Sequence, residues 1–121
     1  MRELIEQIIL LAEARNVEEE SILLKHDPKG MGIRGDNIEF RKEPRPKDKE
    51  LENFLAGLTQ EQLEYIATVM YGGRDFLTYG ERPSFERVLA GIKGDLHLDD
   101  MIGEKVPLPE YLQAGMKIYK I

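Results

Sequence analysis

The sequence predicts an all-α, mainly helical fold, and three observations support this prediction. Apolar residues recur at i, i+3, i+4 and i+7 in several segments, which is the spacing of a buried helix face. Helix-start signals precede some of these segments, and the clearest is the capping box of Thr59 and Gln62. The chain has 121 residues, enough for one domain with its own core. We therefore expect a single compact domain over 1–121, with five to six helices and one irregular loop.

The first half contains one clear helix and the irregular loop. Apolar residues with helical spacing predict a helix over 2–15, which Asn16 ends. The segment Ser21–Lys25 is too short for periodicity to decide, so it reads as a short strand or a buried extended segment. Residues 26–50 are rich in glycine, proline and basic side chains, which predicts an irregular surface loop. Within it, Asn37–Arg41 alternates polar and apolar residues like an exposed strand, so the loop has room for a short hairpin.

The second half contains the best-marked helices. A helix from Lys47 runs to Leu58, and the next begins at Thr59 and ends at Gly72–Gly73, since glycine readily adopts the left-handed conformation of a C-cap. Ser84 begins another helix. A short helix follows Asp95 and ends at Gly103, and Pro109 starts the last one. The helix after Thr59 supplies the central buried residues, which we expect to be Leu63, Ile66, Ala67 and Met70.

Composition limits the class of protein. Hydrophobic residues make up 41% of the chain and charged residues 33%, which is too apolar for disorder and too charged for a membrane protein. The longest apolar run, Ile8–Ala12, is far below the ~20 residues that span a bilayer. The net charge of −6 argues against nucleic acid or an anionic membrane as the partner. Because the chain has no cysteine and no recognisable secretory signal, we expect a cytoplasmic protein.

The candidate binding site is the segment Gly72, Gly73, Arg74 and Asp75. Two glycines permit a sharp turn at the end of the predicted helix, and an Arg and an Asp follow at once. A structural role is the favoured alternative. Arg74 would donate to the last carbonyls of the helix, and Asp75 would cap the turn or pair with Arg74.

Three further motifs do not have the context that their functions require. The segment 30–35 matches G-x-G-x-x-G, but a nucleotide-binding loop needs a strand before it and a helix after it. The tripeptide Arg34-Gly35-Asp36 resembles a cell-adhesion signal only by coincidence. Asp95, His97 and Asp99 alternate at the start of a helix, where their side chains would diverge rather than converge on an ion. We therefore expect no metal and no cofactor.

Three parts of the chain resemble one protein family: Ile5–Arg15, the stretch from Leu58 to Asp75, and the end Pro107–Met116. It is an uncharacterised family of unknown function that is common in proteobacteria. Its members typically have a Gly-Arg-Gly-Asp turn and a Pro-Leu-Leu-x-x-Tyr-Leu tail. This chain instead has Gly-Gly-Arg-Asp, preceded by Tyr71 where the family usually has tryptophan. The resemblance covers nearly the whole chain. It implies a small helical bacterial protein and assigns no activity.

The hypothesis that these observations favour is a non-catalytic module that self-associates into a homo-oligomer or binds another protein, rather than an enzyme. No residue pattern indicates a catalytic centre. The candidate contact surfaces are the basic loop within 26–50 and the last helix with Tyr111 and Tyr119, since arginine and tyrosine are enriched at interfaces. A small hydrolase or transferase built around Arg74 and Asp75 with His97 is one alternative. An acidic protein that mimics nucleic acid and blocks a binding partner is the other.

Overall fold

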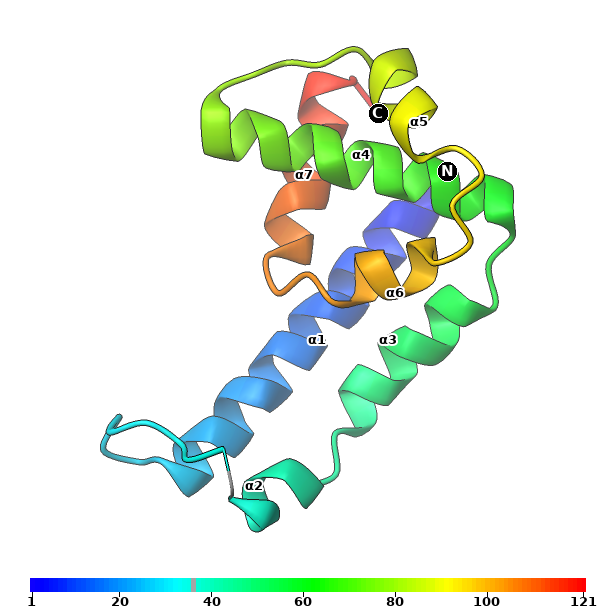
Figure 1. The fold of residues 1–121 in the computed structure, drawn as a ribbon. Helices are drawn as coiled ribbons and strands as arrows, with labels where there is room; N and C mark the ends of the chain where they lie inside the picture. Colours follow the sequence, from blue (N-terminus) through cyan, green and yellow to red (C-terminus); the bar gives the residue numbers. More distant parts are fainter. Residues whose placement is uncertain (36) are drawn as a thin grey trace.

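The computed structural model describes residues 1–35 and 37–121, and these residues form an all-α fold (Figure 1). Asp36, the last residue of the Arg-Gly-Asp tripeptide, lies outside the described residues. Within the described ranges there is no strand, so the predicted fold class is confirmed. The helices are α1 (Arg2–His26), α2 (Ile38–Lys42), α3 (Pro46–Ala56), α4 (Gln60–Tyr79), α5 (Phe85–Ile92), α6 (Leu98–Gly103) and α7 (Leu108–Ile118).

The core lies where α4 packs on α7, and α1 packs beside them on α7 and α3 (Figure 1). The four residues predicted for its centre are buried, which confirms the periodicity of α4. The helices α3, α6 and α7 each add two fully buried leucine or isoleucine side chains around them. The other core residues are Ile5, Ile8, Ile9 and Ala12 of α1, Leu51 and Leu55 of α3, Val69 and Tyr71 of α4, Leu98 and Ile102 of α6, and Leu108 and Leu112 of α7.

The centre of the fold is a close crossing of α4 and α7. Gly72 and Gly73 of α4 face α7, and Gly115 of α7 faces α4. A Cβ atom on Gly73 would overlap the carbonyl oxygen of Tyr111, and one on Gly115 would overlap that of Val69. Only glycine therefore lets the two backbones approach this closely.

The predicted end of a helix at Gly72–Gly73 is wrong, because α4 continues to Tyr79 and ends at Gly80. Gly80 has φ +71°, the left-handed conformation of a helix C-cap, and its N–H donates to the Phe76 carbonyl. Gly72 and Gly73 are thus needed for close packing and not for positive φ, which makes the predicted Gly-Gly turn a helical segment.

The predicted helix over 2–15 is too short, since α1 continues past Asn16 to His26. The Asn16 side chain does not end the helix, because its Nδ2 donates to the Val106 carbonyl 2.9 Å away. The predicted extended segment Ser21–Lys25 is therefore helical. Glutamate, leucine and lysine are good helix formers, and no glycine or proline interrupts this stretch before Pro28.

The predicted loop over 26–50 is also wrong in extent. Its described residues include α2 and the start of α3, and the predicted strand at Asn37–Arg41 belongs largely to α2. The Asn37 side chain accepts a hydrogen bond of 2.9 Å from the Phe40 N–H, so it acts as an N-cap. The alternation of five residues favoured a strand, but the N-cap at Asn37 favours a helix, and the helix is what forms. Helix α2 raises the number of helices above the predicted five to six.

Replacement of Gly73 by Ala should destabilise the protein by about 1–3 kcal/mol or more, because the new methyl group overlaps backbone rather than a movable side chain. Gly91 of α5 is the matched control. A Cβ there meets no atom within 4 Å, so Gly91→Ala should stabilise the protein by about 0.5–1 kcal/mol. Urea unfolding measures both changes. Equal stabilities of the two variants would contradict the close crossing.

The capping box at Thr59 is confirmed and permits a second test. The Gln62 N–H donates to Thr59 Oγ1 over 3.1 Å, and the Thr59 N–H donates to Gln62 Oε1 over 2.9 Å. Thr59→Ala should lower the free energy of unfolding by about 0.5–2 kcal/mol, since it leaves one of these N–H groups without its acceptor. Thermal unfolding at neutral pH would measure the loss. An unchanged midpoint would show that the Thr59 side chain does not stabilise the start of α4.

Candidate functional site

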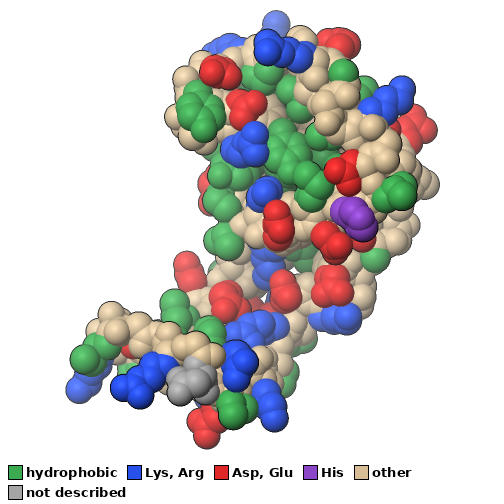
Figure 2. All heavy atoms as spheres, in the orientation of Figure 1, with side chains coloured by type: hydrophobic (Ala, Val, Ile, Leu, Met, Phe, Trp, Pro, Cys, Tyr) green, Lys and Arg blue, Asp and Glu red, His purple; other side chains and the backbone are tan. Residues whose placement is uncertain are grey.

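The candidate site is a groove of about 600 Å³ between the second half of α4 and α5. The extended segment 81–83 forms one wall, and Met101 of α6 contributes to the floor. Figure 2 shows hydrophobic side chains exposed at the level of α4, with charged side chains of both signs around them. The lining residues are Tyr71, Arg74, Asp75, Glu81, Arg82, Pro83, Arg87, Val88, Gly91, Ile92 and Met101.

The outer wall of the groove is held in place by Tyr119 at the end of α7. Its hydroxyl donates a 2.9 Å hydrogen bond to the Pro83 carbonyl, which fixes the segment that leads into α5. Phe85, the first residue of α5, packs against the rings of Tyr119 and Tyr65, with centroids 5.4 and 5.2 Å away. Ser84 caps α5 by accepting a hydrogen bond from the Arg87 N–H. These contacts place α5 beside α4 and leave the groove between them.

Three arginines line the groove, and they differ in how they are engaged. Arg74 pairs with the neighbouring Asp75 at 3.1 Å and lies over the Tyr71 ring, 4.6 Å from its centroid. Arg82 lies 5.0 Å from the ring centroid of Phe76, an arrangement that favours a cation over an aromatic face. Within residues 1–35 and 37–121, neither Arg82 nor Arg87 forms an ion pair. Among the described residues, the rim of the groove therefore carries two exposed arginines without an ion-pair partner, together with the carboxylate of Glu81.

The floor of the groove is apolar. Val88 and Ile92 of α5 and Met101 of α6 are half-buried there, with Tyr71 almost fully buried beneath them. Gly91 lies between the two α5 residues and adds no side chain to the wall. An apolar floor with charged groups at its edge is the usual composition of a binding site on a protein surface.

The electrostatics of the wall are most evident at Tyr119. Burial raises the pKa of the Tyr119 hydroxyl above its usual value, and the negative charges of Asp75 and Glu86 raise it further. Both effects disfavour the phenolate. The hydroxyl is thus held in the protonated form that donates to the Pro83 carbonyl.

The structure separates the four residues of the predicted site. Arg74 and Asp75 line the groove, but Gly72 and Gly73 are buried against α7 and Tyr119 and do not line it. Arg74 lies inside α4 and pairs with Asp75, so its predicted role at a helix C-terminus is wrong. Arg82, Arg87 and Gly91 were not predicted as site residues. Gly91 is the one feature of the sequence that could have pointed to this part of the groove, because a glycine within a predicted helix often has a packing or functional reason.

Of the residues of the alternative enzyme site, Arg74 and Asp75 line the groove and His97 does not. His97 is the N-cap residue of α6 and is exposed, and its N–H donates to Asp95 Oδ1 over 2.8 Å. Asp99 lines a different, smaller hollow of about 230 Å³ beside Asp48. Among the described residues that line the groove with Arg74 and Asp75, there is no histidine.

A second hollow, of about 630 Å³, lies between α1, the start of α3 and the connection from α6 to α7. Its cations are engaged in holding the fold. Arg15 is 8% exposed and donates to the carbonyls of Gly103 and Lys105. Burial lowers the pKa of this guanidinium, and the negative charge of Asp48 opposes that effect.

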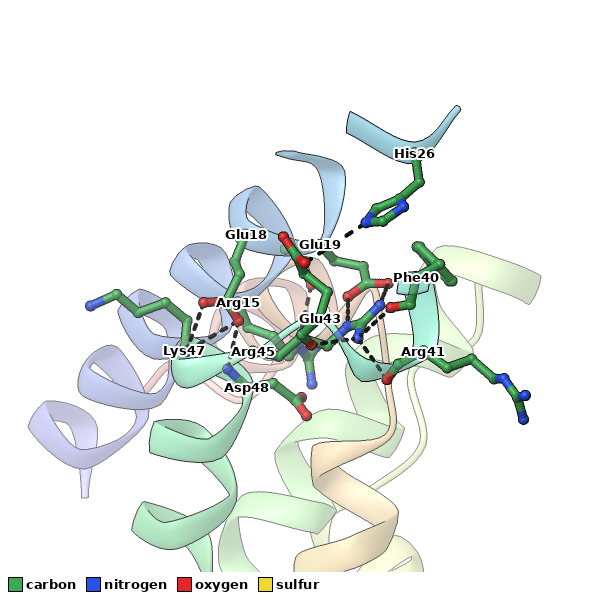
Figure 3. Close-up of polar contacts among 11 residues, drawn as sticks. Arg15, Glu18, Glu19, His26, Phe40, Arg41, Glu43, Arg45, Lys47 and Asp48 are labelled. Carbon is green, nitrogen blue, oxygen red and sulfur yellow. Dashed lines mark hydrogen bonds and ion pairs between the residues drawn. The ribbon is translucent and has the colours of Figure 1, made fainter. Parts of the chain in front are cut away.

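Polar side chains beside this hollow also connect α1 to α2 and α3 (Figure 3). Arg45 donates to Glu19 Oε2 over 2.7 Å and to the carbonyls of Phe40 and Glu43. The Glu18 carboxylate accepts hydrogen bonds from the N–H groups of residues 47 and 48 and so caps α3. Because these groups are satisfied within the chain, the second hollow is better explained by packing than by ligand binding.

No protein-family model, curated protein or solved structure matches this chain. In the part of the chain that the structure describes, no helix combines the length and the apolar character needed to cross a bilayer. Over the same residues, no three histidine, aspartate or glutamate side chains are grouped so that they could hold a metal ion. The case for function therefore depends on the geometry of the groove.

Tyr119→Phe should test the wall of the groove through its pH dependence. At neutral pH the variant should lose about 0.5–1.5 kcal/mol, the net contribution of one hydrogen bond. Because the pKa of Tyr119 is higher in the folded than in the unfolded protein, its protonated hydroxyl stabilises the fold. This stabilisation is complete below the pKa of an unfolded tyrosine, about 10. It is lost as the pH rises through the pKa of Tyr119 in the folded protein. The stability gap between the two proteins should therefore shrink above pH ~10. A gap that stays constant to higher pH would contradict the role of Tyr119.

Proposed function

We propose that this chain is a non-catalytic binding module that binds another protein through the groove between α4 and α5. The observation that carries the proposal is the pair of exposed arginines, Arg82 and Arg87, which have no ion-pair partner among the described residues and lie at the edge of an apolar floor. Arginine and aromatic residues are enriched where proteins bind one another, and apolar side chains supply most of the binding energy. The proposal includes a bacterial cytoplasmic setting, in line with the family resemblance and the lack of cysteine.

A different protein is a better partner for this groove than a second copy of the chain in a two-fold dimer. A two-fold interface brings the same surface of both copies together. Where the two-fold axis passes through the groove, the positive rim of one copy would meet the positive rim of the other, and facing like charges are unfavourable. A second copy bound head to tail would avoid this conflict, so the oligomeric state is part of the test.

Gly91→Trp should block the groove with little effect on the fold, because a Cβ at this exposed position has no neighbouring atom within 4 Å. Gly91→Ala is the matched control, since it changes the same helix but leaves most of the space open. Both variants should unfold at or above the wild-type midpoint. Immobilised wild-type protein and Gly91→Ala should retain the same protein from a lysate of the source cells, and Gly91→Trp should lose it.

Quantitative mass spectrometry of the retained proteins measures that difference, and light scattering measures the mass of each variant in solution. Retention of the same proteins in equal amount by all three baits would contradict binding through the groove. A wild-type dimer that Gly91→Trp converts to a monomer would show that the partner is a second copy bound head to tail.

A further inference from the structure

We propose that the occupant of the groove is an extended acidic peptide segment with an apolar side chain between carboxylates. This inference rests on the proposed function and adds the chemistry of the partner. The apolar side chain would lie on the floor formed by Val88, Ile92 and Met101. The flanking carboxylates would pair with Arg82 and Arg87 at the rim.

Charge is the first reason. The groove has three arginines against two carboxylates, although the whole chain has a net charge of −6. Asp75 pairs with Arg74, so an incoming anion would meet Arg82 and Arg87, which outnumber the remaining carboxylate, Glu81. Contact with the Phe76 ring orients the Arg82 guanidinium before any ligand arrives. Such preorganisation lowers the entropic cost of forming a paired hydrogen bond with a carboxylate.

Gly91 is the second reason, because packing does not explain it. It lies in the last turn of α5 without positive φ, and a Cβ there would have no neighbour within 4 Å. Glycine lowers the stability of a helix relative to alanine. The missing side chain leaves that wall of the groove low, so that the main chain of a ligand can come close to the helix backbone.

Shape is the third reason. The charged rim residues Glu81, Arg82 and Arg87 are exposed, whereas the floor residues are half-buried. The groove is thus open along its edge and does not enclose a small molecule on all sides. An extended chain suits this shape, since its side chains alternate between the floor and the rim.

Nucleic acid fits the groove less well than an acidic peptide. Its affinity comes from the neutralisation of many phosphates in a row, and two free arginines offer few such contacts. The negative charge of the rest of the surface would repel a long polyanion, and acidic side chains gather on the same face at the level of α6 and α3 (Figure 2). A short segment with two carboxylates avoids that repulsion.

The probe is a fluorescein-labelled peptide of sequence Gly-Glu-Asp-Leu-Glu-Asp-Gly, and fluorescence anisotropy measures its binding. We expect wild-type protein to bind it about tenfold or more tightly than the peptide in which Gln and Asn replace the acids. Replacement of the peptide leucine by alanine should also weaken binding. Added salt should weaken it as well, because the rim charges are exposed and screened.

The double variant Arg82→Glu, Arg87→Glu should lose binding by about tenfold or more and should instead bind the peptide Gly-Lys-Lys-Leu-Lys-Lys-Gly. The matched control is Arg34→Glu, Arg41→Glu, which changes the net charge equally at exposed positions outside the groove. This control should keep wild-type affinity for the acidic peptide. Circular dichroism should show both double variants to be folded, since both arginine pairs are exposed.

Two results would overturn the inference. Equal losses in the two double variants would show that only net charge matters. Failure of the acidic peptide to bind more tightly than its amide counterpart would show that the groove does not recognise acids. In either case, the proposed binding function would still hold if the wild type retained a partner protein and Gly91→Trp did not. If Gly91→Trp has no effect on either partner or peptide, the proposed function fails as well.

Discussion

The close approach of α4 and α7 at Gly72, Gly73 and Gly115 is the constraint on which the rest of the structure depends. It sets the distance between the helices that carry the centre of the core, and it determines where the end of α7 lies. Tyr119 is placed there, against Gly72, and its hydroxyl reaches the Pro83 carbonyl. The segment before α5 is thereby fixed, and so is the outer wall of the groove. A wider crossing would move Tyr119 away and leave α5 without this anchor.

Local signals in the sequence were enough to predict the all-α fold, the capping box at Thr59 and the buried face of α4. They failed where the outcome depended on distant residues. A glycine pair is compatible with positive φ at a helix end and with close packing inside a helix, and only the position of α7 decides between them. For the same reason, only part of the site was predicted. Arg74 and Asp75 were found from their neighbours in sequence, whereas Arg82 and Arg87 reach the groove through tertiary contacts, among them the Tyr119 hydrogen bond to Pro83.

The two hollows differ in whether their charged side chains have partners within the protein. Around α1, α2 and α3, Arg15 and Arg45 donate to backbone carbonyls, and Glu18 and Glu19 accept from the segment that starts α3 (Figure 3). Each of these groups is satisfied within the chain, and removal of one would leave a partner without its hydrogen bond. In the groove, the rim arginines have no ion-pair partner among the described residues. Charged side chains that contribute little to the stability of the fold are the ones that we expect to bind a ligand.

Helix α5 lines the site, and none of its described residues is fully buried. It is held by the Phe85 ring, by half-buried apolar side chains and by hydrogen bonds at its two ends. The Tyr119 hydroxyl donates to Pro83 before α5, and the Gly94 N–H after it donates to Glu64 over 2.8 Å. Elements with few buried contacts open at lower free energy than the core. Gly91 lowers the helical stability of α5 further, in the wall that a ligand would touch. A ligand that contacts both α4 and α5 would therefore stabilise the outer wall of its own site, because binding to the closed arrangement alone shifts the equilibrium toward it.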